Sequence, residues 1–454
     1  MQITNSYEKK SLSGWGCAFY SKSKVFSPKS VNEIQDLIKS SYPEGIIARG
    51  LGRSYGNPAQ CDKGSVIDMT SVNHIFLDIE SATIKAGGGA SIDEILKIII
   101  PKGFFIPVSA GTRYVTVAGA VAADIHGKNH HIDGSFANHI TEIKIIDGLG
   151  NLKTLRPDSK TSNDYFWATT GGMGLTGIIY EVSFKLISIE TSLISVDTKR
   201  CNTLDELMNE MVENDKKYRY SVAWVDSLNE SGRGVITAGD HAKINDINSS
   251  QNNNKNLYYD PKAVTSAPPI FPNGLLNKFT VSMFNEAWYR KAPKKKNNEL
   301  QTISSYFHPL DGVRNWNKIY GPKGFLQYQF VIPDEASYLI RKTLNSLKKV
   351  GAPSFLTVLK RFGDGNDGLL SFPMKGWTLA ADVPIAVNGL FDVLDSLDDE
   401  VASSGGRLYL AKDSRQTSRT FRSTYSNIDK WIKIKNKLDP NGIFQSDLSR
   451  RIGL

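Results

Sequence analysis

Residues 109–139, SAGTRYVTVAGAVAADIHGKNHHIDGSFANH, combine two residue classes that seldom occur together in a surface loop. Small residues dominate the first half, and the second half holds four of the seven histidines: His126, His130, His131 and His139. Small residues let a backbone approach a flat or charged ligand and offer it amide groups. Histidine adds a donor, an acceptor or a proton relay near neutral pH. The segment therefore predicts a bound cofactor.

A glycine-rich turn follows a predicted strand at residues 46–48. It reads Arg49, Gly50, Leu51, Gly52, Arg53, Ser54, Tyr55, Gly56 and Asn57. Successive amide groups of such a turn can bind a pyrophosphate. The turn lacks the GxxxxGK[ST] pattern of a P-loop, and Tyr55 stands where a GxGxxG fingerprint has its third glycine. Taken alone, the segment is equally consistent with an ordinary β-turn.

Thr116 is predicted to cap a short helix whose free amide groups face an anion or a carbonyl-rich ring. His126, His130 and His131 follow it. A metal site is not expected there, because HExxH and His–carboxylate spacings are absent. The adjacent His130 and His131 would also point in opposite directions on a strand.

Three further segments could line a polar cavity. Gln327 and Gln329 face the same side of a strand, and two amides suit a polyhydroxylated ligand. Solvent-facing glutamines are the alternative. Lys360 and Phe362 lie in the second segment. Lys412, in the string YLAKDSR, could stabilise a reduced flavin ring or hold a substrate hydroxyl, although most such charged strings are merely solvated.

The elements that must position these groups indicate an α+β fold. In the first part of the chain, strands are predicted at residues 46–48, 65–69, 82–85, 143–148 and 177–186, with a glycine-rich turn at 171–174. Helices are predicted at residues 30–40 and 91–100. Each begins with a serine N-cap followed three residues later by a glutamate, the capping-box pattern.

The middle of the chain predicts a second sheet, because residues 324–331 and 353–359 are β-like. Residues 243–256, KINDINSSQNNNKN, and 291–300, KAPKKKNNEL, are polar and poor in apolar groups. Both are predicted to be mobile loops that gate a site or touch a partner.

Composition and charge exclude several classes of protein. The chain has 454 residues, 40% apolar and 22% charged, which fits two globular domains. Its three cysteines form no CxxC pair, so neither a disulfide framework nor a zinc ribbon is expected. No signal peptide or apolar run of ~20 residues is visible, which predicts a cytoplasmic protein.

The net charge of +9 includes basic clusters at residues 294–296 and 450–451. They serve solubility, or they attract anionic lipid head groups or a phosphorylated substrate. Nucleic acid is not an expected partner, because no helix-turn-helix, zinc-finger or RNP pattern accompanies the charge.

Long strings of the chain resemble the decaprenylphosphoryl-β-D-ribose 2-oxidases, flavin subunits of a 2′-epimerase within the vanillyl-alcohol-oxidase-type superfamily. They run in order from about residue 13 to the end, and include RGLGRSYGNPAQ, GTRYVTVAGAVAADIHGKNHH, FWATTGGMGLTGII, FPNGLLNK, GPKGFLQYQFVIP and GGRLYLAKDSR. The resemblance implies a PCMH-type FAD-binding domain, residues 1–190 with 407–454. An inserted substrate domain, residues 191–406, would be built on an antiparallel sheet.

The resemblance also implies roles for individual residues. Lys412 matches the family's essential lysine, and with Tyr55 it is a candidate catalytic base. The substrate pocket would include Lys128, Gln327, Gln329, Lys360, Phe362 and Ala380. FAD would contact Arg49, Gly50, Gly52, Arg53, Ser54, Tyr55, Gly56, Asn57, Gly111, Thr112, Thr116, Val117, Ala118, Gly119, Ala123, Asp124, His126, Gly127, Ile178, Tyr409 and Lys412.

The implied reaction oxidises the 2-hydroxyl of a polyprenyl-phosphoryl ribose to a ketone, which a partner reductase of the short-chain dehydrogenase type then reduces. Peripheral contact with the inner membrane surface would follow from a lipid substrate. Two alternatives stay open: a flavin oxidase of a soluble sugar, aldonolactone or alditol, and a flavin-binding scaffold without turnover.

Two departures from related patterns carry expectations. Arg53 stands where several related oxidases have a histidine that attaches covalently to the flavin, so non-covalent FAD is predicted. Ala380 stands where mycobacterial members have a pocket cysteine, which predicts resistance to inhibitors that bond to that thiol.

Overall fold

The structure, a computed structural model, describes residues 6–40, 42–247, 256–263, 265–267 and 276–454. Residues 248–255 of the predicted loop 243–256, and 271–275 of the string FPNGLLNK, lie outside the described residues.

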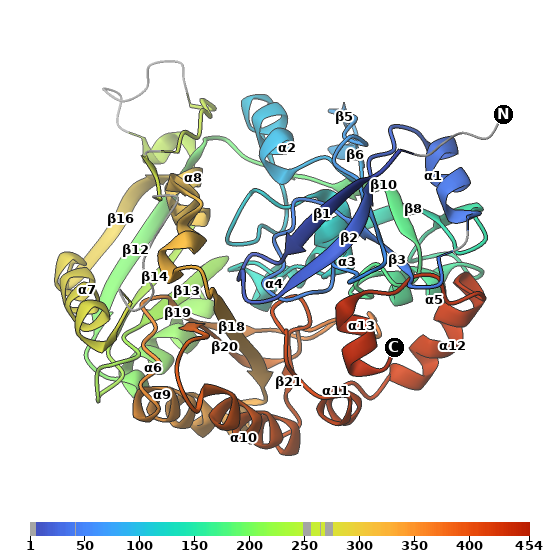
Figure 1. Ribbon diagram of the computed structural model, residues 1–454. Coiled ribbons are helices and arrows are strands. Elements are labelled where there is room, and N and C mark those ends of the chain that lie inside the picture. The colour runs from blue at the N-terminus through green and yellow to red at the C-terminus, as the bar shows by residue number, and fades with distance from the viewer. Residues whose placement is uncertain (1–5, 41, 248–255, 264, 268–275) are drawn as a thin grey trace.

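The first part of the chain forms two sheets, on the right-hand side of Figure 1. One has the order β1-β2-β4-β3, with β4 parallel to both β2 and β3. The other is antiparallel, with the order β5-β6-β10-β8-β9. The strands are β1 (Glu8–Ser13), β2 (Tyr20–Phe26), β3 (Ile46–Arg49), β4 (Ser65–Asp68), β5 (Ile75–Asp78), β6 (Thr83–Gly87), β8 (Ile140–Ile146), β9 (Leu152–Leu155) and β10 (Ile178–Lys185).

Both predicted capped helices are confirmed. The Ser30 side chain accepts a hydrogen bond from the Glu33 amide, and Ser91 and Glu94 form a complete capping box. Among the described residues, no helix has the length and apolar character that crossing a membrane requires. The helices of this part are α1 (Val31–Ile38), α2 (Ile92–Ile99), α3 (Val117–Ala122), α4 (His130–Asp133) and α5 (Asn163–Thr169).

The middle of the chain forms one antiparallel sheet of eight strands, which confirms the predicted second sheet (Figure 1). Its order is β16-β12-β14-β13-β19-β20-β18-β21. The strands are β12 (Leu193–Cys201), β13 (Tyr220–Val225), β14 (Gly234–His241), β16 (Lys295–Thr302), β18 (Phe325–Ile332), β19 (Thr357–Phe362), β20 (Gly376–Pro384) and β21 (Arg407–Leu408). Two short pairs flank the sheets: β7 (Phe104–Phe105) with β11 (Ile187–Ser188), and β15 (Thr265–Ser266) with β17 (Val313–Arg314).

The prediction of a loop at residues 291–300 is wrong. Most of that segment belongs to β16, which pairs with β12 at the edge of the eight-stranded sheet. An edge strand has one open side, so exposed lysines are tolerated there and discourage pairing with other chains. Helices of this part are α6 (Leu204–Asp215), α7 (Lys278–Lys291), α8 (Ile303–Phe307), α9 (Tyr338–Lys349) and α10 (Leu390–Ser403).

The end of the chain returns to the first part, where red helices lie beside blue strands in Figure 1. The Ile46 amide donates to the Ile443 carbonyl at 2.8 Å, and the Trp431 indole N–H donates to the Ala168 carbonyl at 2.8 Å. Its helices are α11 (Ser418–Thr424), α12 (Ile428–Leu438) and α13 (Asp447–Ile452). Helices and largely antiparallel sheets in this arrangement confirm the α+β class.

Candidate functional site

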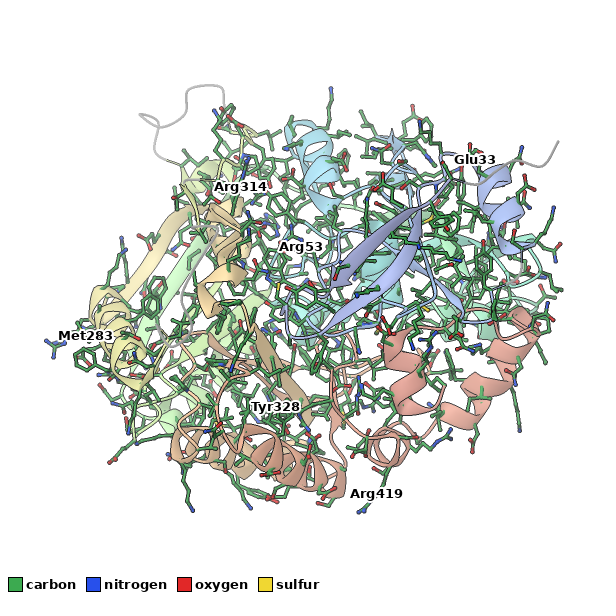
Figure 2. The ribbon with its side chains drawn as sticks, viewed as in Figure 1. Glu33, Arg53, Met283, Arg314, Tyr328 and Arg419 are labelled. Carbon is green, nitrogen blue, oxygen red and sulfur yellow. The ribbon has the colours of Figure 1, made fainter. Side chains whose placement is uncertain are left out.

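One cavity of about 870 Å³ lies between the first part of the chain and the eight-stranded sheet. Its size falls within the range of about 300–1,000 Å³ usual for ligand and cofactor sites. The glycine-rich turn after β3, helix α3, strands β18 to β20 and the turn at residues 409–412 all contribute to its wall. Arg53, from the first of these, lies near the middle of the molecule in Figure 2.

The glycine-rich turn presents unused donors. None of the amide groups of residues 50–54 donates a hydrogen bond within the part of the chain that the structure describes. Gly52 has φ +63°, and a Cβ there would lie 2.3 Å from the Arg49 guanidinium, which donates to the carbonyls of Ser13 and Ala59. Consecutive unpaired amides form an anion-binding concavity. The turn therefore fits a pyrophosphate.

The start of α3 is different from what we predicted. Thr116 caps the helix, accepting from the Gly119 amide at 3.2 Å. The amides of Val117 and Ala118, however, donate to the carbonyls of Ala90 and Gly88 at 2.8 and 3.0 Å, so the expectation of free amides facing an anion is wrong. The turn after β6 packs against this helix end and uses them. The helix instead offers the cavity a surface of small residues: Ala118, Gly119, Ala122 and Ala123.

His126 is a buried, neutral cavity residue. Burial and the nearby Lys360 lower its pKa well below the ordinary value. The Gln329 amide lies 3.2 Å from His126 Nε2. With that amide as donor, the hydrogen of the imidazole is on Nδ1, which is buried and has no partner among the described residues.

Three lysines line the same cavity: Lys128, Lys360 and Lys412. Burial lowers their pKa values to about 7, about 8 and about 7. The Lys128 ammonium lies 3.9 Å from the centre of the Tyr306 ring, and the Lys412 ammonium lies 3.8 Å from that of Tyr55. Clustered cations in a low-dielectric site favour an anionic ligand.

Asp382 is the residue that the sequence reasoning missed. It lies on β20 directly opposite Gln327 on β18, whose side-chain amide donates to it. Burial raises the pKa of Asp382 to about 7, and Lys412 opposes that rise. In turn, Asp382 raises the pKa of Lys412, while burial and Lys360 lower it. A lone carboxylate in the apolar string GWTLAADVP was the available signal.

Tyr55 and Tyr409 bracket the lysine. The Tyr55 amide donates to the Ala411 carbonyl at 2.9 Å, and burial raises the pKa of its phenol well above the ordinary value. The Tyr409 hydroxyl donates to the Ala123 carbonyl at 2.9 Å, and its ring stacks on Phe372. Residues near the two ends of the chain therefore meet at one point of the cavity wall.

Most predicted site residues reach the cavity. The ones that line it are Arg49, Gly50, Gly52, Arg53, Ser54, Tyr55, Gly111, Thr112, Thr116, Ala118, Gly119, Ala123, His126, Lys128, Gln327, Gln329, Lys360, Ala380, Tyr409 and Lys412. Gly111 borders open space, because nothing lies within 4 Å of a Cβ placed on it.

Seven predicted residues do not line the cavity: Gly56, Asn57, Val117, Asp124, Gly127, Ile178 and Phe362. Asp124 is fully buried and accepts hydrogen bonds from the Ser135 hydroxyl, the Ala137 amide and the Asn366 amide, so it supports the loop. A Cβ on Gly56 would lie 1.8 Å from the Asp413 carbonyl, which makes this a packing glycine. Ile178 lies in the core, whereas its neighbours Gly177 and Ile179 face the cavity.

The far end of the cavity is apolar and was not predicted. Aliphatic and aromatic side chains from one face of the eight-stranded sheet, from α7 and from the segment before β19 form it: Val222, Trp224, Val235, Phe284, Trp288 and Phe355. The cavity therefore joins a cationic, hydrogen-bonding region to an apolar extension. An amphiphilic anionic molecule matches both ends.

Comparison with known proteins relates this architecture to flavoproteins. Residues 23–156 match the family of FAD binding domains. The chain is 41% identical over 453 residues, 98% of each chain, to decaprenylphosphoryl-β-D-ribose oxidase of Mycolicibacterium smegmatis. It is 32% identical over 80% of its length to an uncharacterized protein of Streptomyces coelicolor, all of which is covered. It is also 22% identical to L-gulono-1,4-lactone dehydrogenase of Mycobacterium tuberculosis, over 95% of this chain and 96% of that protein.

Proposed function

This chain belongs to the decaprenylphosphoryl-β-D-ribose oxidase family, and from that premise we propose that it oxidises the 2-hydroxyl of a polyprenyl-phosphoryl pentose to a ketone. The observation that carries the proposal is the single cavity that joins unpaired amides, three lysines and an apolar extension. A sugar phosphate with a prenyl tail has the charge and the amphiphilic character to fill it.

FAD is the cofactor, and the residues present fit it. The amides of residues 50–54 suit its pyrophosphate, and the small residues of α3 leave room for a flat ring. When bound, FAD supplies the acceptor for the hydride of the carbinol carbon. We further propose that it binds without a covalent bond, because Arg53 replaces the attaching histidine of related oxidases.

Lys412 is the proposed base, and Tyr55 is not. A pKa of about 7 leaves a large share of the Lys412 amine neutral near pH 7, so its nitrogen can accept the proton of the substrate hydroxyl. The Tyr55 phenol has a pKa well above 10 and stays protonated. Gln327 and Gln329, both facing the cavity from β18, would orient the sugar hydroxyls.

The finer organisation is part of the same proposal. Residues 1–190 and 407–454 would form a PCMH-type FAD-binding domain, and residues 191–406 an inserted substrate domain. The ketone would pass to a short-chain dehydrogenase-type reductase, completing a 2′-epimerisation that supplies an arabinose donor for cell-envelope polysaccharide. The protein would work in the cytoplasm at the inner membrane surface.

An anaerobic substrate screen tests the proposal. We expect farnesylphosphoryl-β-D-ribose to bleach the flavin absorbance at about one equivalent, while free ribose and L-gulono-1,4-lactone leave it yellow. A Lys412→Ala variant should retain FAD and lose bleaching by the prenyl substrate. Bleaching by the lactone alone would favour the aldonolactone oxidase alternative, and no bleaching by any compound would favour a scaffold.

A further inference from the structure

Helix α7 exposes four large apolar side chains. Phe279 and Met283, four residues apart, are 72% and 59% exposed, and Phe284 and Trp288 are each 45% exposed. Met283 projects from the outer edge of the molecule, on the left of Figure 2. With 3.6 residues per turn, Phe279 and Met283 lie on one side of α7, and Phe284 and Trp288 lie on another. Large apolar groups gathered on one exposed helix, rather than scattered singly over a surface, mark an interaction surface.

The opposite face of α7 is firmly anchored, so this exposure belongs to a folded helix. Val281, Asn285 and Tyr289 are buried at four-residue spacing. The Asn285 amide donates to Asp226 at 2.8 Å, and the Tyr289 hydroxyl donates to Asn202 at 3.1 Å. The fold therefore holds the exposed apolar side chains of α7 at the surface.

The surroundings of these exposed apolar side chains are strongly cationic. Residues 277–298 contain six lysines and arginines against one glutamate, Glu286. That glutamate already pairs with Arg233 and Arg290. Lys278, Arg290, Lys291 and Lys294 are exposed around the helix. Exposed aromatic and apolar side chains interspersed with lysines and arginines are a combination that holds a surface at the head groups of an anionic membrane.

Two of the four exposed side chains also line the cavity. Phe284 and Trp288 stack with ring centres 6.2 Å apart, and both line the apolar end of the cavity together with Lys291. The same side chains thus border the outside surface and the interior.

We propose that the α7 surface (Phe279, Met283, Phe284, Trp288 and the bordering Lys278, Arg290, Lys291 and Lys294) docks on an anionic lipid bilayer. This inference rests on the proposed function, because it assigns the docked cavity mouth to the entry of a prenyl-phosphoryl substrate. Interfacial aromatic residues and cations together hold such a surface at the head-group level.

Vesicle flotation of the FAD-loaded enzyme tests the docking. We expect it to float with vesicles of phosphatidylglycerol and phosphatidylcholine, and about tenfold less with phosphatidylcholine alone. A Phe279→Ser/Met283→Ser variant, which changes no cavity residue, should bind the anionic vesicles about tenfold or more weakly. The matched control is Phe76→Ser/Ile79→Ser, at 62% and 56% exposure near β5, which should bind as the unchanged protein does.

Three results would overturn the inference: an enzyme that never floats, an α7 variant that floats like the control, or a lipid-free dimer that the α7 variant dissociates. The last would assign the surface to a second copy of the chain. Flavin bleaching by farnesylphosphoryl ribose without vesicles separates this test from that of the function. Bleaching without flotation would contradict the proposed docking and support the proposed reaction. Flotation without bleaching would support the docking and contradict the reaction.

Discussion

At Lys412, burial and two charged neighbours act on one proton. Burial and Lys360 favour the neutral amine, whereas the Asp382 carboxylate favours the ammonium. The result is a pKa of about 7 for a side chain that ordinarily titrates above 10. A general base is most effective when its pKa lies close to the working pH.

The rate of flavin reduction should therefore rise with pH through about 7, as Lys412 loses its proton. Replacing Asp382 with Asn removes the charge that raises the Lys412 pKa, so the rising limb should move to lower pH by about one unit or more. Anaerobic stopped-flow measurement between pH 5 and 9 gives both curves.

Asp398→Asn is the matched control for this profile. Asp398 is also a buried carboxylate with a pKa raised to about 7, but it pairs with Arg415 and is not among the groups that shift the Lys412 pKa. Its replacement should leave the limb in place. An Asp382→Asn limb that coincides with that of the unchanged enzyme would remove Asp382 from the proton equilibrium.

Ala380 carries a second prediction at the residue scale. It lines the cavity on β20, opposite Gln329. Inhibitors that bond to a pocket thiol should leave the unchanged protein unlabelled, because Cys61 and Cys201 are buried and Cys17 lies outside the cavity wall. Ala380→Cys should gain one adduct by intact-mass spectrometry. Stoichiometric labelling of the unchanged chain would contradict this.

Sequence reasoning located the site residues whose placement depends on one short segment alone. Gln327 and Gln329 follow from the alternation of a strand, and both reach the cavity. The role of Asp382 could not be predicted in this way, because its partner Gln327 lies 55 positions away and only sheet register brings the two residues together. The same limit explains the amides of Val117 and Ala118, which a turn remote in sequence already uses.

At the scale of elements, Arg113 joins two of them to the loop segment that carries it. Its guanidinium is 2% exposed and contacts Asp93 of α2 at 2.6 Å and Asp311, from the 3₁₀ turn Pro309–Gly312, at 3.5 Å. The Arg113 amide also donates to Asp311 at 2.9 Å. This network holds the cavity segment around Gly111 against both parts of the chain.

Arg113→Met should lower the free energy of unfolding by about 3–5 kcal/mol, because it removes the cation paired with the buried Asp311 and leaves Asp93 with only the exposed Lys97. Lys97→Met is the control, since Lys97 pairs with the same Asp93 from a 52% exposed position and should cost less than about 1 kcal/mol. Urea unfolding followed by circular dichroism measures both. Equal losses for the two variants would contradict a special role of the buried network.

Helix starts were predictable because their caps are local. Ser30 and Ser91 act within three residues of themselves, and both helices form where expected. Strand β16 was not predictable, because its polarity suits an edge position and nothing within the segment reveals that position. The partner strand β12, about a hundred residues earlier, decides it.

Across the whole molecule, FAD should act as a structural bridge, because the cavity wall takes residues from the first part, the central sheet and the turn at residues 409–412. Acid precipitation should release all flavin into the supernatant. At free FAD about 100-fold above its dissociation constant, the protein should be about 2.7 kcal/mol more stable than the apoprotein. Yellow colour that stays with the pellet would contradict non-covalent binding.

Strand β3 precedes the glycine-rich turn, and within the described part of the chain its outer edge is completed by residues 443–445, through Ile46. On the ribosome, this edge stays bare until residues 443–445 have been made. A bare strand edge templates pairing with other chains. Nascent or prematurely terminated chains should therefore depend on chaperones, and a stop codon shortly before Ile443 should yield inclusion bodies rather than a partly active enzyme.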